Sequence, residues 1–168
     1  WIIYGLGHAG YAMRDAYLAA YRKSVENALE EGYRGTKGIF HDKKFTDYSR
    51  VIVAMSAVGM DATNVDGYDL TAPLADFVNI KWQGMNGPIW ALLALDSKNY
   101  DAPGREELIT SILGQQFKDG GWAVTPEGSA PVTTADVDMT AMAIQALAPY
   151  YNTRNDVKDA VDKALVCL

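Results

Sequence analysis

The stretch Thr133-Thr-Ala-Asp136-Val-Asp138-Met-Thr-Ala-Met-Ala-Ile-Gln-Ala-Leu147 decides the fold of this chain. From Asp136 onward it is rich in alanine and methionine, which favour helix. Asp136 and Asp138 lie in the expected first turn, where the helix dipole stabilises negative charge. Thr133 and Asp136 have the spacing of a capping box at a helix start. The small residues predict a helix that packs closely on nearly every side and is therefore buried.

The same helical pattern occurs at three earlier places in the chain. The stretch Asp47-Tyr-Ser-Arg-Val-Ile-Val-Ala-Met-Ser-Ala-Val-Gly59 aligns without a gap with the stretch that begins at Asp136. A third copy is Asn86-Gly-Pro-Ile-Trp-Ala-Leu-Leu-Ala-Leu95, and a truncated fourth, Trp1-Ile-Ile-Tyr-Gly-Leu6, opens the chain. The recurrence indicates stacked helical units that cannot bury their apolar faces alone.

The copies keep a constant register. Leu6 aligns with Leu95 (95 − 6 = 89) and Val58 aligns with Leu147 (147 − 58 = 89), so equivalent positions are 89 residues apart. A unit of two helix pairs therefore occurs once in residues 1–85 and again in residues 86–168, within a single domain that spans residues 1–168.

Amphipathic segments lie between the small-residue helices. Their apolar residues follow helical spacing and charged residues occupy the rest of the wheel. We therefore expect an all-α fold in which buried inner helices alternate with half-exposed outer ones. The predicted pairs are Trp1–Gly7 with Asp15–Glu31, Asp47–Gly59 with Leu70–Ile80, Pro88–Asp96 with Arg105–Gln116, and Asp136–Tyr150 with Asn155–Leu168.

The composition narrows the functional class. The net charge of −6 argues against a nucleic-acid partner, whose phosphates require a basic face. No apolar run has the length of a membrane span. Cys167 is the only cysteine, so neither an intramolecular disulfide nor a cysteine metal cluster is expected. The chain starts at Trp1, inside an apolar helical run, which predicts a fragment of a longer protein.

Two motifs carry a family resemblance. Gln116-Phe-Lys-Asp-Gly120-Gly-Trp122 resembles the Gln-x-x-x-Gly-x-Trp repeat of squalene and terpene cyclases. Asp136-Val-Asp138-Met-Thr-Ala141 resembles the Asp-x-Asp-Asp-Thr-Ala acid motif of the same enzymes. The resemblance implies the α/α toroid shared by these cyclases, protein prenyltransferase β subunits and the α domain of cobalamin carriers. A complete toroid has six hairpins, and the roughly four present here imply part of a ring.

The acid motif leaves two interpretations of Asp136 and Asp138. In the cyclases the middle acid protonates an alkene or epoxide, and Asp138 is the matching residue, so both acids are catalytic candidates. The last acid of the motif is replaced by Met139, which has no ionisable group. The alternative is that Asp136 and Asp138 are ordinary first-turn acids stabilised by the helix dipole.

Two kinds of bound group are not expected. The prenyltransferase β subunits bind zinc through Asp, Cys and His, but Cys167, His8 and His41 have no ligand spacing in this chain. Gly5-Leu-Gly-His-Ala-Gly10 has the spacing of a dinucleotide fingerprint but lacks the strands that the fingerprint requires. We expect neither a metal nor a cofactor.

These observations favour a non-catalytic binding or scaffold module of a secreted or surface bacterial protein, the location being implied by the resemblance alone. Gln116, Gly120 and Trp122 are interpreted as the repeat motif. A small hydrophobic or cobalamin-like ligand is expected near five residues of the inner helices: Asp47, Asn86, Trp90, Asp136 and Asp138. The alternative is a class II terpene cyclase-like or prenyltransferase-like enzyme, with Asp138 as the proton donor of the cyclase.

A partial ring also predicts association. Its end hairpins lack a neighbour and would expose apolar residues such as Ile2, Ile3, Val161 and Leu165. Large exposed apolar patches are rare on soluble monomers. We therefore expect either a homodimer or coverage by the remainder of the chain.

Overall fold

The computed structural model describes residues 1–125 and 132–168, and this part of the chain contains seven α-helices and no strand. The prediction of an all-α fold is thus confirmed. The helices are α1 (Ile2–His8), α2 (Asp15–Glu31), α3 (Thr46–Ala57), α4 (Asn86–Asp96), α5 (Arg105–Leu113), α6 (Val137–Leu147) and α7 (Asn155–Cys167). Short 3-10 helices follow α3 and α6, namely η1 (Ala72–Ala75), η2 (Ile80–Gln83) and η3 (Ala148–Tyr150).

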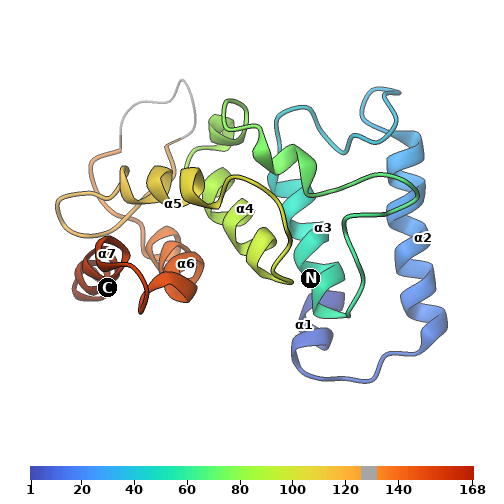
Figure 1. The fold of residues 1–168 in the computed structure, drawn as a ribbon, viewed down its shortest axis with the longest axis horizontal. Coiled ribbons are helices and arrows are strands. Elements are labelled where there is room, and N and C mark those ends of the chain that lie inside the picture. Colours follow the sequence, from blue (N-terminus) through green and yellow to red (C-terminus); the bar gives the residue numbers. More distant parts are fainter. Residues whose placement is uncertain (126–131) are drawn as a thin grey trace.

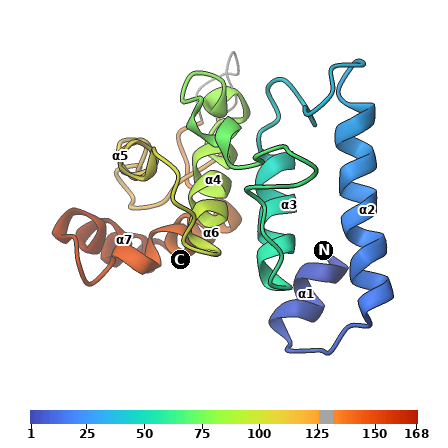
Figure 2. The same ribbon diagram turned by 45° about the vertical axis from the view of Figure 1, so that its right-hand side comes forward.

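The four helices expected to be inner ones contact each other in chain order. α1 packs on α3, α3 packs on α4, and α4 packs on α6 (Figure 1). α5 packs on α4 and on α7, and α7 packs on α6, so these two helices form a second layer along the C-terminal part of the row (Figure 2). α2 lies beyond α3 in both views.

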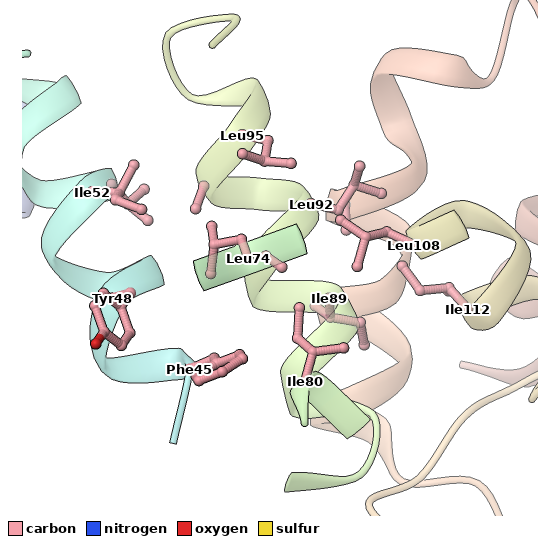
Figure 3. Close-up of a cluster of buried hydrophobic side chains, with 14 of the residues drawn as sticks. Phe45, Tyr48, Ile52, Leu74, Ile80, Ile89, Leu92, Leu95, Leu108 and Ile112 are labelled. Atoms are coloured by element: carbon pink, nitrogen blue, oxygen red, sulfur yellow. The ribbon is translucent and has the colours of Figure 1, made fainter. Parts of the chain in front are cut away.

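α4 is the centre of the core. Ile89, Ala91, Leu92, Ala94 and Leu95 have no exposed surface, because α3, α5, α6 and η2 surround the helix. Figure 3 shows Ile89, Leu92 and Leu95 among the side chains from α3, η1 and α5. Burying one such side chain stabilises the fold by about 1.5–3 kcal/mol.

The start of α4 also requires a glycine. A Cβ atom added at Gly87 would lie 1.7 Å from the carbonyl oxygen of Ile80, so η2 packs backbone against backbone on α4. Any larger residue at this position would force the two segments apart.

The helix predicted over Leu70–Ile80 is absent. In its place, η1 and η2 are separated by a turn. The Asp69 carboxylate accepts hydrogen bonds from the Thr71 amide (2.8 Å) and hydroxyl (2.7 Å), and Asp76 accepts one from the Asn79 amide (3.1 Å). Such local bonds compete with the helical pattern. The amphipathic spacing of this segment therefore predicted its secondary structure wrongly.

The start and the burial of α6 also differ from the prediction. Asp136 rather than Thr133 is the N-cap, and its Oδ1 accepts a hydrogen bond of 2.8 Å from the Met139 amide. Only one side of α6 is buried, since Thr140 and Ala143 have no exposed surface whereas Ala141 is exposed.

Two further predictions need correction. The principal contact of α1 is with α3 rather than with its predicted partner α2. Of the four apolar residues predicted to lie on open faces, Ile2 (69%) and Leu165 (58%) are exposed, whereas Ile3 (6%) and Val161 (4%) are buried. Ile3 and Val161 lie on the sides of α1 and α7 that face the protein.

Candidate functional site

A cleft of about 650 Å³ lies between α1, α3, α4 and α6. Three groups of side chains line it: the aromatic Trp1, Tyr4 and Trp90; the aliphatic Val53, Ala57, Leu93 and Met142; and the polar His8, Ser56, Asp96, Ser97 and Gln145. A volume of this size and a largely apolar lining are typical of small-molecule sites.

The lining follows the internal repeat. Trp1 and Trp90 occupy equivalent positions (90 − 1 = 89), and so do Val53 and Met142 (142 − 53 = 89). Three further lining pairs have the same separation: Tyr4 with Leu93 (93 − 4 = 89), His8 with Ser97 (97 − 8 = 89), and Ser56 with Gln145 (145 − 56 = 89). Both halves thus present the same helix faces to one cleft.

Aromatic rings form one wall. The Trp1 ring lies 5.4 Å from the Trp90 ring and 5.8 Å from the Tyr4 ring, measured between centroids. The Tyr4 ring lies 4.4 Å from the imidazole of His8. Trp1 is 68% exposed, so most of its surface is open to a ligand. The guanidinium of Arg50 lies 5.8 Å from the Trp90 ring centroid, within the range of a cation–π contact.

Hydroxyl groups form another part of the lining. Ser97 Oγ lies 2.8 Å from Ser56 Oγ, and Ser56 Oγ lies 3.0 Å from the hydroxyl oxygen of Tyr100. Tyr100 is buried, and its hydroxyl oxygen accepts a hydrogen bond of 3.3 Å from the Ala62 amide. A buried tyrosine therefore fixes the two serine hydroxyls from behind.

The acid in the cleft is already paired. Asp96 Oδ1 accepts a hydrogen bond of 2.8 Å from Arg105 Nε, and the Tyr150 hydroxyl donates to both Asp96 oxygens at 3.0 and 2.9 Å. Burial, together with the hydrogen bond to Asp96, raises the pKa of Tyr150 above its usual range, so the phenol remains a neutral donor. Asp96 is thus tied to the protein and is poorly placed to act on a ligand.

The five predicted ligand residues are distributed over different parts of the surface. Trp90 lines the cleft. Asn86 and Asp138 lie outside the lining, each one helical turn before a lining residue, Trp90 and Met142 respectively. Asp138 is exposed to solvent.

The remaining two predicted residues have other surroundings. Asp136 caps α6 through its bond to the Met139 amide. Asp47 lines a separate hollow of about 480 Å³ with Tyr21, Phe40 and Arg50.

The repeat-motif residues join two helices, α5 and α7. The Gln116 side-chain amide donates to the carbonyls of Gly120 and Ala160, both at 2.7 Å. Trp122 has no exposed surface, and its indole nitrogen donates to the Ile112 carbonyl at 2.7 Å. A Cβ at Gly120, whose φ is 97°, would lie 2.6 Å from the Lys163 carbonyl oxygen. These contacts fix the turn that follows α5 against both α5 and α7.

The sequence interpretation missed most of the cleft. It did not single out Tyr4, His8, Ser56, Ser97 or Gln145 as ligand residues. A signal for them was present, because the 89-residue register that aligned the inner helices also aligns these positions. Which side of each helix faces the cleft depends on the packing angle between helices, and the register does not contain this angle.

A second hollow, of about 630 Å³, lies on the outer side between the 3-10 helices and α5, lined among others by Phe77, Lys81, Glu106 and Glu107. Its lining combines Phe77, Ile80 and Lys81 of residues 1–85 with Pro88 and side chains between Glu106 and Gln115, but no two of its lining positions are 89 residues apart. The inner cleft is the better candidate, since equivalent positions of the two halves line it.

Comparison of the chain with known protein families, with curated proteins and with solved structures finds no match. Among the residues that the structure describes, no three His, Cys, Asp or Glu side chains converge as a metal ion would require. The helices of residues 1–125 and 132–168 include none that is long and apolar enough to cross a membrane.

Proposed function

We propose that this protein is a non-catalytic binding module that takes a small ligand into the cleft between α1, α3, α4 and α6. The observation that supports this most directly is the lining itself: equivalent faces of both halves meet around one aromatic-walled space of about 650 Å³. A ligand there would contact all four inner helices. The internal repeat would thus form a ligand-binding site and not a catalytic one.

The geometry gives less support to the cyclase-like alternative. A proton donor to an alkene must be enclosed together with its substrate, so that water does not compete for the proton. Asp138 is exposed, and Asp136 is engaged as the cap of α6. Asp96, the acid in the cleft, is paired with Arg105 and Tyr150. No candidate acid therefore combines enclosure with freedom to donate.

The architecture that we propose is part of an α/α toroid. The chain-order contacts of α1, α3, α4 and α6, with α5 and α7 outside them, support it. In the cobalamin carriers, which share the toroid that the cyclase-like motifs imply, such a fold serves ligand binding. A location outside the cell or on its surface is proposed on the same resemblance.

A neutral fluorescent probe, N-phenyl-1-naphthylamine, tests the proposed site. We expect one saturable binding event per chain. Gln145→Trp places a large ring on an exposed lining position of α6 and should abolish binding, because it fills the cleft. Val166→Trp on α7 is the matched control, since Val166 is 88% exposed and lies outside the lining. Equal probe binding by wild type and Gln145→Trp would contradict the proposal.

A further inference from the structure

The cleft combines open aromatic faces with fixed hydroxyl groups, and its one carboxylate, Asp96, is paired within the protein. We propose that its ligand is a neutral carbohydrate, in which a sugar ring stacks on the Trp1 and Trp90 wall and its hydroxyls bond to Ser56, Ser97 and Gln145. This inference rests on the proposed binding function and specifies the ligand class.

The aromatic wall suits a sugar ring. One face of a pyranose presents C–H groups, whose slight positive charge is attracted to the negative face of an aromatic ring. Trp1 is 68% exposed, so the wall is open to water. A sugar tolerates this because its outer hydroxyls stay hydrated. A long apolar chain in the same place would leave much of its surface in water, whereas ligand sites usually bury most of an apolar ligand.

The polar side supplies hydrogen bonds of the right kind. A hydroxyl group has one proton and two lone pairs. Ser56 and Ser97 use their protons on each other, on Tyr100 and on the Ala94 carbonyl, to which Ser97 Oγ donates at 2.7 Å. Lone pairs remain on both oxygens to accept hydrogen bonds from ligand hydroxyls. Among the described residues, the exposed side-chain amide of Gln145 has no hydrogen-bond partner in the protein, and it offers both donors and an acceptor.

The carboxylate in the cleft and the helix ends beside it are paired within the protein. Arg105 neutralises Asp96 and also donates to the Leu95 carbonyl at the end of α4 at 2.8 Å. Lys98 Nζ donates to the carbonyls of Gly59 and Met60, at 3.2 and 3.1 Å, just after α3. The negative ends of both helices thus already have a cation. Arg50 is held against Trp90 at the rim. Asp96 is the only carboxylate among the lining residues, and the exposed His8 is the only basic side chain among them. A ligand with several charges would therefore find few partners in the cleft.

Isothermal titration calorimetry with cellotetraose, maltotetraose and chitotetraose tests the inference, with displacement of N-phenyl-1-naphthylamine as the second readout. We expect at least one of the three to bind and displace the probe. Raising salt from about 0.05 to about 0.5 M should leave its Kd unchanged, because a neutral ligand is not screened.

Three variants locate the contacts. Trp1→Ala should weaken sugar binding about tenfold or more, as loss of an aromatic anchor does at other interfaces. Ser56→Ala should weaken it severalfold. Tyr11→Ala, which removes another exposed ring (64% exposed) outside the cleft, should leave the Kd unchanged. Circular dichroism checks that each variant is folded.

The outcomes separate the two proposals. If the probe binds in the cleft and 1-decanol displaces it but none of the sugars does, the carbohydrate inference is overturned and the binding function stands. Sugar binding that survives Trp1→Ala unchanged would also overturn it. If neither the probe nor any sugar binds, the binding function itself is wrong.

Discussion

α3 and α6 occupy equivalent places in the two halves, yet they bury different sides. Tyr48 and Ile52 of α3 are buried, whereas the equivalent Val137 (137 − 48 = 89) and Ala141 (141 − 52 = 89) of α6 are exposed. α3 packs between α1 and α4, while α6 has α4 and α7 as its main neighbours. A repeat in sequence therefore specifies which residues recur, but the positions of the flanking helices decide which of them are buried.

The same comparison applies to the elements that follow these helices. α6 is followed by η3 and α7, whereas α3 is followed by only two short 3-10 helices. The inner face nevertheless keeps its register, because the lining pairs of the cleft are still 89 residues apart. The outer layer thus varies between the halves while the inner face is retained, as expected if the inner face carries the function.

The largest expected effect concerns Trp122 and its equivalent, Tyr33 (122 − 33 = 89). Trp122 is fully buried and bonded to the Ile112 carbonyl, so Trp122→Ala should lower the free energy of unfolding by about 3–5 kcal/mol. Tyr33 is only half-buried, and Tyr33→Ala should cost about 1 kcal/mol. Urea denaturation followed by circular dichroism measures both. Equal losses would show that the turns around Trp122 and Tyr33 contribute equally to the free energy of unfolding.

The second prediction contrasts α3 with α6 directly. Ile52 has no exposed surface, so Ile52→Ala should cost about 2–5 kcal/mol in the same urea experiment. Val137 is 68% exposed, and Val137→Ala should stay within about 0.5 kcal/mol. A loss at Val137 as large as that at Ile52 would mean that another surface covers α6 in solution.

The same contrasts separate the features of the fold and of the cleft that the sequence predicts from those that it does not. The inner helices were predictable, since their small-residue pattern occurs four times and a constant offset of 89 residues relates the copies in two pairs. The turns at Leu70–Ile80 were not, because local bonds from Asp69 and Asp76 compete with an amphipathic spacing that fits a helix equally well. Of the candidate site, Trp90 was predicted, whereas the serines and Gln145 depend on how the helices are turned toward each other.

The third prediction uses a cluster that only the second half has. Asp96, Arg105 and Tyr150 correspond to Gly7, Ala16 and Asp61 in the first half, which cannot form the same bonds. Tyr150→Phe should cost about 1–2 kcal/mol near neutral pH, through loss of the bond to a charged acceptor.

The same cluster predicts the alkaline behaviour. The pKa of Tyr150 is raised in the folded protein by burial and by Asp96, so folding favours the neutral phenol. This stabilisation is complete below the unfolded pKa of about 10 and is lost as pH rises from there toward the folded pKa. The wild type should therefore lose more stability above about pH 10 than Tyr150→Phe does. Parallel curves for the two proteins would contradict the assignment.

The smallest expected effect is weak self-association through the last hairpin. Exposed apolar side chains gather on α6 and α7, where Val137 is 68%, Leu165 58% and Val166 88% exposed. α3, the equivalent of α6, has α1 against it on one side, and contact with a second copy of the chain would give α6 comparable cover. A two-fold dimer is the commonest arrangement of identical chains. Sedimentation velocity should show a concentration-dependent dimer that Leu165→Lys shifts toward monomer. Val78→Lys, at an 84% exposed apolar position in the first half, should not shift it. A strictly monomeric wild type, or an equal effect of both variants, would show that the exposed side of α6 is stable without a partner.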